Sequence, residues 1–402
     1  MTEVKRDWFD QYMMPNYAPA AFIPVKGQSS KVWDQEGREY LDFSSGIAVT
    51  SLGHCNPEIN EVLKKQSDEL WHLSNIYAFE PSLKAAKALV EASGLDKVFF
   101  CNSGAEANEA AFKLARRYCF NKFGQEKCQI ISFKQSFHGR SFFTVSVGGQ
   151  EKYSDGFGPK PGAVTHVNFN DLEQLKDVVN EKTCAIVLEL IQGEGGVVPA
   201  TQEFVDGVKS LCEKFQCLMV VDEVQTGIGR TGKLFAYEHF GIKPDIVSLA
   251  KALGNGFPVG AVLATDEVSA AFEFGTHGST YGGNPIAGAV VEKVLDIMQR
   301  EGFLESVNKK SQKIINSLNA VNEKTQLFKE VRGKGLLIGA ELNDSYKGKA
   351  KDFLQAMREE GVLALVAGPD VLRFAPALNI SEIDLSTGLC NIEKAIQSVL
   401  SK

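Results

Sequence analysis

The sequence predicts an α/β protein with a large domain, built on a mostly parallel sheet flanked by helices, and a smaller α+β domain. The middle of the chain alternates short β-rich runs with segments of helical periodicity. Glycine-rich joints follow several of these runs, where open α/β sheets bind their ligands. Near residue 290 the pattern changes, and helical segments are then separated by shorter apolar runs.

The large domain is predicted to begin its sheet at KVFFC (97–101), a buried strand that leads directly into a helix. Ser103, followed three residues later by Glu106, is typical of a helix N-cap. A second helix is expected over 201–215. The further predicted strands are QIISF (129–133), CAIVLELI (184–191), CLMVVDE (217–223), DIVSLA (245–250) and VGAVLA (259–264).

The two ends of the chain are predicted to form the smaller domain together. Residues 32–43 have the pattern of a β-hairpin, which fits the large sheet poorly. The last helix is expected to start at Ser381. We therefore predict an N-terminal segment of the small domain over 1–55, the large domain over 56–290 and the remainder of the small domain over 291–402.

Composition narrows the class of protein. The 402 residues carry a net charge of −7, which argues against nucleic acid as a partner. No apolar run approaches the ~20 residues of a membrane-spanning helix, and the N-terminus lacks the apolar core of a secretory signal. The eight cysteines form no CxxC pair, and the six histidines show no metal-binding spacing. A cytoplasmic enzyme without a protein-bound metal is expected.

Two segments could bind a phosphorylated, planar ligand. Ser103, Gly104 and Ala105 lie between a strand end and a helix start, where free N–H groups and the helix dipole favour an anion. A plain strand-to-helix turn would show the same pattern. Phe137 and Arg140 place an aromatic face, which can stack on a ring, beside a guanidinium that can bind a carboxylate.

Three charged residues lie in apolar surroundings. Asp222 ends a buried run, so it needs a cationic partner, and a structural ion pair is the competing explanation. Lys251 follows another strand, where partial burial would favour the neutral amine that forms Schiff bases. Arg373 lies within the apolar run VLRFAPAL, which indicates an anionic ligand or a buried carboxylate as its partner. Together with the phosphate cradle and the ring stacker, these groups are those that pyridoxal phosphate requires.

The motifs NSGAEANEAA, SFHGR, QGEGGV, VVDEVQTGIGRTG, SLAKALGNGFPVGA, GSTYGGNP and VLRFAPAL resemble those of the class III, ornithine-type, pyridoxal-phosphate aminotransferases. The likeness runs from about Tyr17 to the C-terminus, and among the bacterial members it is greatest to the enzymes that act on acylated diamino acids. It implies a fold-type I enzyme with a seven-stranded-type sheet. It also implies a homodimer whose active sites lie at the subunit interface.

The resemblance implies a role for each matching residue. Lys251 carries the covalent link to the cofactor and moves the substrate proton, and Asp222 pairs with the pyridine nitrogen. Phe137 stacks on the ring, and Gln225 contacts its 3-hydroxyl. Thr280 reaches the phosphate of the neighbouring subunit's cofactor. The implied cofactor-binding set is Ser103, Gly104, Ala105, Phe137, Asp222, Val224, Gln225, Lys251 and Thr280.

For the substrate, the resemblance implies that Arg140 binds the α-carboxylate of N2-acetyl-L-ornithine, whose distal amine reacts. Arg373 would bind glutamate and 2-oxoglutarate, with Glu194 masking it when the longer substrate is bound. The apolar Ile47 stands where ornithine aminotransferases have Tyr, which favours an acylated amine. The full substrate-binding set is Arg140, Ser279, Arg373, Glu194, Tyr17 and Ile47.

Several functions remain open from the sequence. The expected activity serves arginine synthesis, with N-succinyl-LL-2,6-diaminopimelate in lysine synthesis as a second substrate. Succinylornithine transamination in arginine breakdown requires the same pocket, and ornithine δ-transamination differs chiefly at Ile47. A non-transferring enzyme with the same cofactor, or a binding protein that has kept the fold, are the alternatives from other classes.

Overall fold

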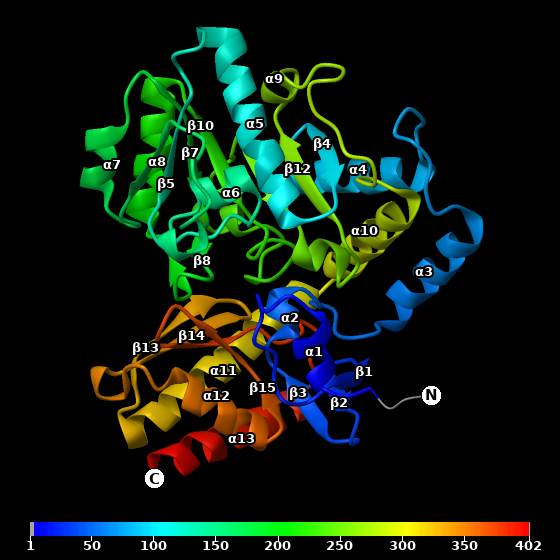
Figure 1. The fold of residues 1–402 in the computed structure, drawn as a ribbon, viewed down its shortest axis with the longest axis vertical. Helices are drawn as coiled ribbons and strands as arrows, with labels where there is room; N and C mark the ends of the chain where they lie inside the picture. Colours follow the sequence, from blue (N-terminus) through cyan, green and yellow to red (C-terminus); the bar gives the residue numbers. More distant parts are fainter. Residues whose placement is uncertain (1–3, 402) are drawn as a thin grey trace.

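A seven-stranded sheet forms the centre of the larger part of the molecule (Figure 1) in the computed structural model, which describes residues 4–401. The strand order is β4-β12-β11-β10-β7-β5-β6. β12 runs antiparallel to both neighbours, whereas the other adjacent pairs are parallel. The strands are β4 (Lys97–Cys101), β5 (Gln129–Phe133), β6 (Val164–Val167), β7 (Thr183–Leu188), β10 (Leu218–Asp222), β11 (Ile246–Leu249) and β12 (Gly260–Ala264).

The central strands are buried along their whole length, which explains their sequences. All residues of β7 and β10 are buried, because helices cover both faces of a parallel sheet. These strands therefore appear as continuous apolar runs instead of alternating patterns. The predicted mostly parallel sheet is confirmed.

Helices cover both faces of the sheet (Figure 1). α5 (Gly104–Phe123) packs against β11 and β12 through an alanine-rich face. The Ser103 hydroxyl accepts the N–H of Glu106 at 3.2 Å, as the cap signal predicted. The other helices of this part are α3 (Pro57–Glu69), α4 (Glu80–Ser93), α6 (Phe142–Val147), α7 (Leu172–Val178), α8 (Gln202–Phe215), α9 (Asp266–Ser269) and α10 (Pro285–Met298).

Two four-stranded sheets and three helices form the smaller part. One sheet has the order β13-β14-β17-β16, and the other has the order β1-β2-β3-β15. The strands are β1 (Pro24–Gln28), β2 (Lys31–Asp34), β3 (Glu39–Asp42), β13 (Phe328–Lys334), β14 (Leu337–Leu342), β15 (Val362–Leu363), β16 (Leu365–Ala367) and β17 (Val371–Phe374). The helices are α11 (Phe303–Thr325), α12 (Ala350–Glu359) and α13 (Glu382–Leu400).

The two ends of the chain meet in this smaller part. β2 and β3 form the predicted hairpin, and β3 pairs in parallel with β15, more than 300 residues later. The division at 1–55, 56–290 and 291–402 stays a prediction; α10 runs through its second boundary and packs on α3 and α4. The remaining short α-helices and strands are α1 (Asp7–Tyr12), α2 (Ser45–Ala48), β8 (Ile191–Gln192) and β9 (Val198–Pro199), and four 3-10 helices lie at Glu151–Tyr153, Ala236–Phe240, Lys251–Gly254 and Asp344–Tyr346.

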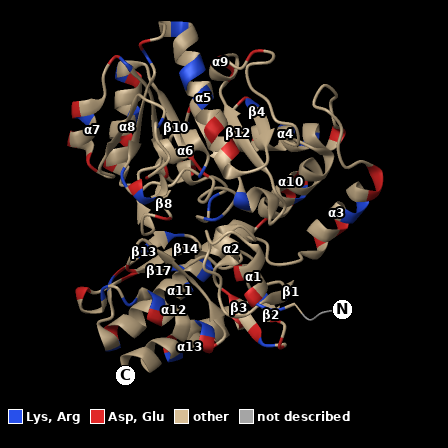
Figure 2. Cartoon of the chain, viewed as in Figure 1, with Lys and Arg blue, Asp and Glu red and all other residues tan. Residues whose placement is uncertain are grey.

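Charged side chains of both signs are interspersed over the helices (Figure 2). Within residues 4–401, no helix combines the length and the apolarity needed to span a bilayer. The same residues contain no group of three or more His, Cys, Asp or Glu placed to hold a metal ion.

Candidate active site

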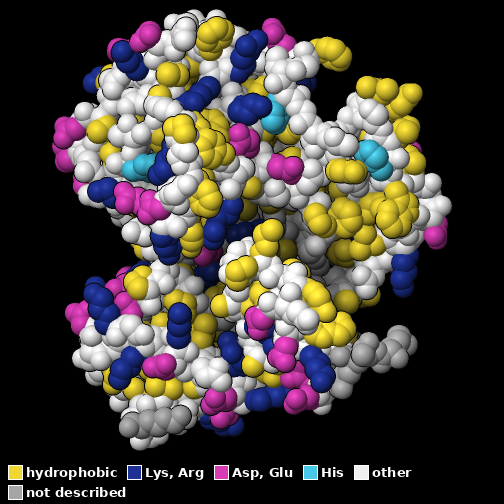
Figure 3. All heavy atoms as spheres, viewed as in Figure 1, with side chains coloured by type: hydrophobic (Ala, Val, Ile, Leu, Met, Phe, Trp, Pro, Cys, Tyr) yellow, Lys and Arg dark blue, Asp and Glu magenta, His cyan; other side chains and the backbone are white. Residues whose placement is uncertain are grey.

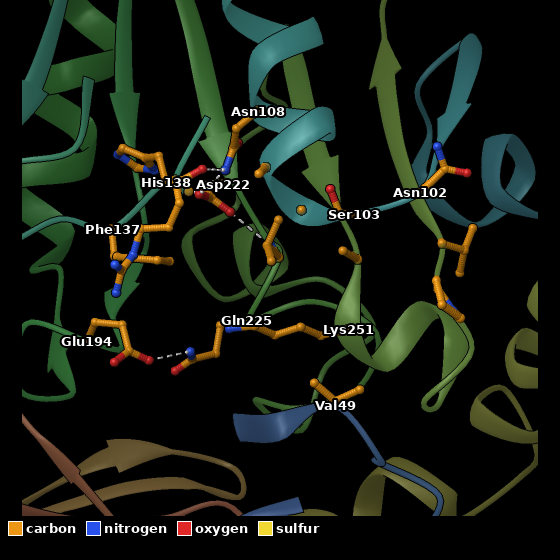
Figure 4. Close-up of a pocket in the computed structure, with 18 of the residues that line it drawn as sticks. Val49, Asn102, Ser103, Asn108, Phe137, His138, Glu194, Asp222, Gln225 and Lys251 are labelled. Carbon is orange, nitrogen blue, oxygen red and sulfur yellow. Dashed lines mark hydrogen bonds and ion pairs between the residues drawn. The ribbon is translucent and has the colours of Figure 1, made fainter. Parts of the chain in front are cut away.

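A cavity of about 360 Å³ lies where the central strands of the large sheet end. Asp222 is the last residue of β10, and Lys251 follows β11 by two positions. Glu189 comes directly after β7, and Phe137 lies in the loop after β5. Because these strands are parallel, their carboxyl ends gather side chains from four separate segments into one site (Figure 4).

Asp222 is held by three donors. Its Oδ2 atom accepts hydrogen bonds from Nδ2 of Asn108 and Nδ1 of His138, both at 2.7 Å. Its Oδ1 atom accepts a hydrogen bond from the backbone N–H of Val224 at 2.9 Å. Only 3% of Asp222 is exposed. These bonds stabilise the carboxylate charge and fix its orientation toward the cavity (Figure 4).

His138 and Asn108 are the functional residues that the sequence analysis missed. Burial lowers the pKa of His138, but the hydrogen bond and the charge of Asp222 outweigh it, so the pKa of His138 is raised. The Oδ1 atom of Asn108 accepts the hydroxyl of Ser248 at 2.6 Å, which directs its amide N–H toward Asp222. The motif SFHGR contained a signal for His138, but its partner lies 84 residues away.

Lys251 is the second charged group of the cavity. Its φ is 47°, a left-handed conformation that costs on the order of 1–3 kcal/mol for a side-chain-bearing residue and is found mostly at functional sites. Withdrawal from bulk water lowers its pKa, the carboxylate of Glu194 opposes this effect, and the Arg373 cation adds to it. A lysine with a lowered pKa has more of its amine in the neutral, nucleophilic form.

The start of α5 presents free backbone N–H groups beside the cavity. Gly104 and Ala105 are the first residues of the helix, so their N–H groups have no acceptor within it and point toward the cavity at the positive end of the helix dipole. A Cβ atom at Gly104 would lie 2.7 Å from Cγ1 of Val224, so glycine permits this close packing. Ser103, Gly104, Ala105 and Val224 line the cavity together, and their predicted role in cofactor binding stays a prediction.

Glu194, which lines the cavity, forms an ion pair with Arg373. The Nη1 atom of Arg373 lies 2.6 Å from Oε1 of Glu194, and Gln225 contacts both residues at 3.4 Å. The nearby guanidinium outweighs burial and lowers the pKa of Glu194. The Nε atom of Arg373 is buried and has no hydrogen-bond partner among residues 4–401. The sequence-predicted contact is present, although its role in switching substrates stays a prediction.

Arg140 also lines the cavity, but its surroundings are different. Its guanidinium lies 4.0 Å from the ring centroid of Tyr153 and 5.6 Å from that of Phe137. Within residues 4–401, no carboxylate lies within ion-pair distance of Arg140. Arg140 is therefore the arginine of the cavity lining that can take a carboxylate from a ligand, whereas Arg373 is paired with Glu194, which lines the cavity.

Five predicted site residues do not line the cavity of this single chain. Arg373 contacts Glu194 of the lining, and Tyr17 and Ile47 are 73% and 43% exposed. Ser279 and Thr280 line an adjoining cavity of about 330 Å³, and the Ser279 hydroxyl contacts Asn102 and Gly282. Their predicted roles stay predictions, and the role of Thr280 involves a second subunit.

Glu189 is a further group that sequence analysis did not assign. It is 6% exposed, and its Oε2 atom accepts the N–H of Phe137 at 3.1 Å. Burial raises the pKa of Glu189 to about 7; the charge of His138 opposes this rise and that of Asp222 adds to it. Its backbone contact holds Phe137 at the edge of the cavity.

The donor set fits pyridoxal phosphate. A cofactor with a phosphate, a basic ring nitrogen and an aldehyde needs an anion cradle, a fixed carboxylate and a reactive amine. The N-terminus of α5, Asp222 and Lys251 provide these three groups around one cavity, and Phe137 offers a ring face. The fold and the site thus define a pyridoxal-phosphate-dependent enzyme.

Comparisons with known proteins identify the family. The aminotransferase class-III family model matches residues 12–396. The chain is 54% identical over 397 residues to an acetylornithine/succinyldiaminopimelate aminotransferase of Photorhabdus laumondii, covering 99% of this chain and 98% of that protein. It is 53% identical over 398 residues to a succinylornithine transaminase/acetylornithine aminotransferase of Pseudomonas aeruginosa, with the same coverage.

The structural comparison agrees. The N-acetylornithine aminotransferase of Stenotrophomonas maltophilia superposes with a TM-score of 0.86 and 38% identity, over 98% of this chain and 99% of that chain. The chain therefore belongs to the class-III aminotransferases. It is a transaminase that uses pyridoxal phosphate, as the sequence predicted.

Proposed function

We propose that this transaminase moves the distal amino group of N2-acetyl-L-ornithine to 2-oxoglutarate, producing glutamate and the corresponding semialdehyde. The observation that carries the proposal is the contrast between two arginines. Among the residues that the structure describes, Arg140 has no carboxylate partner, whereas Arg373 is paired with Glu194. Relatives at 53–54% identity bear names that refer to acylated diamino acids.

The contrast supports two binding modes in one site. Acetylornithine reacts at its δ-amine, so its carboxylate lies far from the reacting atom and binds Arg140, while Glu194 keeps Arg373 neutralised. Glutamate reacts at its α-amine, and its nearby carboxylate then displaces Glu194 from Arg373. Glu194 can leave because 23% of its side chain is exposed, against 3% for Arg373.

The residues of this chain perform the chemical steps as follows. Bound pyridoxal phosphate supplies an aldehyde that takes up the amino group and a ring that accepts electrons. The Nζ atom of Lys251, with its lowered pKa, removes the proton from the amine-bearing carbon of the substrate and returns it later. The Asp222 carboxylate, held by Asn108 and His138, keeps the ring nitrogen protonated.

A half-reaction assay tests this function. The purified holoenzyme is mixed with acetylornithine, succinylornithine and ornithine at equal concentrations, and the absorbance of the bound cofactor is followed. A rapid loss of this absorbance with the two acylated substrates and a slow loss with ornithine support the proposal. The ratio of the rates with acetylornithine and succinylornithine separates a role in arginine synthesis from one in arginine breakdown. Faster reaction with ornithine would contradict it, together with the argument from Ile47.

We also propose a homodimer in the cytoplasm. Large apolar side chains are exposed on the face that carries α3 and α4 (Figure 3), and a second copy of the chain would cover them. Thr280, beside this face, would then reach the partner's cofactor. The exposed apolar residues of this region are Leu70, Trp71, Leu73, Ile76, Tyr77, Leu83 and Tyr281.

A further inference from the structure

The C-terminal end of α8 places two cysteines side by side. Gln216 has a φ of 53°, its N–H donates to the carbonyl of Glu213 at 3.4 Å, and the N–H of Cys217 donates to the carbonyl of Cys212 at 3.0 Å. This is a Schellman motif, in which the residues at the two ends of the closing turn normally make an apolar contact. Here both residues are cysteines.

The backbone bond also sets the distance between them. With standard backbone dimensions, an N···O distance of 3.0 Å holds the two Cα atoms within about 7 Å, the upper limit for a disulfide. The pair therefore meets the Cα–Cα distance requirement for a bond between the sulfur atoms.

The two cysteines can be reached from solvent. Cys212 and Cys217 are 6% and 4% exposed, and both line a cavity of about 300 Å³. Three lysines and two carboxylates also line it, and two of the lysines, Lys122 and Lys209, form ion pairs with Glu267 and Glu213. The cavity lies at the amino end of β10, whereas Asp222 lies at the carboxyl end, so it is separate from the active site.

The two sulfur atoms have different roles. The sulfur of Cys217 and burial together raise the pKa of Cys212 well above its usual value. In a pair that forms a disulfide, the thiol that keeps its proton is the resolving partner, which assigns that role to Cys212 and the first attack to Cys217.

We propose that Cys212 and Cys217 are a redox-active dithiol, a modification site at which a hydroperoxide forms an intramolecular disulfide. With hydrogen peroxide, the Cys217 thiol gives up its proton, its sulfur attacks one peroxide oxygen, the O–O bond breaks, and the departing hydroxide takes up that proton to form water. Cys212 then attacks the sulfur of the resulting sulfenic acid, the S–O bond breaks, and a second water leaves with the Cys212 proton. Two thiols are oxidised and one peroxide is reduced.

Peptide mapping tests the site in the holoenzyme. Trypsin cleaves after Lys214, so Cys212 and Cys217 fall in separate peptides, 210–214 and 215–230. After brief treatment with hydrogen peroxide and blocking of free thiols, we expect these two peptides to be joined, with a mass loss of about 2 Da for two thiol hydrogens. Dithiothreitol should separate them, and Cys212→Ser or Cys217→Ser should each abolish the link.

A second cysteine pair in the same chain is the matched control. The thiol of Cys119 contacts the carbonyl of Cys184 at 3.5 Å, but both residues are 0% exposed. They should stay reduced under conditions that join Cys212 to Cys217. Three outcomes would overturn the proposal: oxidation confined to the exposed Cys55 and Cys390, oxidation of Cys217 to a sulfinic acid without a link, or equal oxidation of the buried control pair.

Discussion

Replacing Glu194 by Gln should shift substrate preference toward α-amines. The change removes the negative charge 2.6 Å from Nη1 of Arg373 but preserves the size of the side chain. In the native enzyme, glutamate must displace Glu194 before its carboxylate can bind Arg373. In the variant, glutamate no longer competes with a side-chain carboxylate for Arg373. When acetylornithine is bound instead, the positive charge of Arg373 has no negative partner.

The magnitude follows from the ion pair. Two unit charges about 4 Å apart attract by about 4 kcal/mol at an effective dielectric constant of about 20. Glu194 recovers most of this energy when it swings into water, because its side chain is already 23% exposed. We therefore expect a net effect of about 1.4 kcal/mol, equivalent to a tenfold rise in the ratio of α-amine to δ-amine use.

The assay compares kcat/KM for glutamate and for acetylornithine in separate half-reactions of the native enzyme and Glu194→Gln. The matched control is Glu330→Gln, which removes a carboxylate 2.9 Å from Arg332 on β13, outside the cavity. It should leave the ratio unchanged. An unaltered ratio in Glu194→Gln would refute the proposed masking of Arg373.

Three further predictions address the proton donor, the support of Asp222 and the dimer. Lys251→Ala should retain the cofactor without a covalent link and lose transamination by about 10⁴-fold or more, measured as glutamate formation; near-native turnover would remove Lys251 from the mechanism. The raised pKa of His138 means that its charged form stabilises the fold below pH 6.5, and this stabilisation is lost as pH rises through the raised value. In melting curves from about pH 6 to about pH 9, His138→Gln should therefore lose less stability than the native chain; identical slopes would contradict this. Thr280→Ala should weaken cofactor binding. When this variant is refolded with an equal amount of Lys251→Ala, about half of the dimers are mixed, and one of the two sites in each mixed dimer has both native residues. About a quarter of the native sites should therefore be restored. No recovery on mixing would argue that Thr280 acts within its own subunit.

Local sequence patterns predicted most of the large domain and the cofactor-binding groups. The Ser103 cap, the buried runs of β7 and β10 and the charged residues at strand ends depend on neighbouring residues, so they can be identified in a single segment. The antiparallel direction of β12 could not be identified in this way. Its run is as apolar as its neighbours, and strand direction depends on the connections and on the partners that it meets.

The sequence by itself determined the kinds of element, the positions of Lys251 and Asp222 after their strands and the family. Only the tertiary structure decided which side chains meet. His138 reaches Asp222 across 84 residues, Arg373 reaches Glu194 across 179, and β3 pairs with β15 at the other end of the chain. The reason is physical: local propensity acts over a few residues, whereas these contacts form only after packing of the buried faces has set the order of the strands.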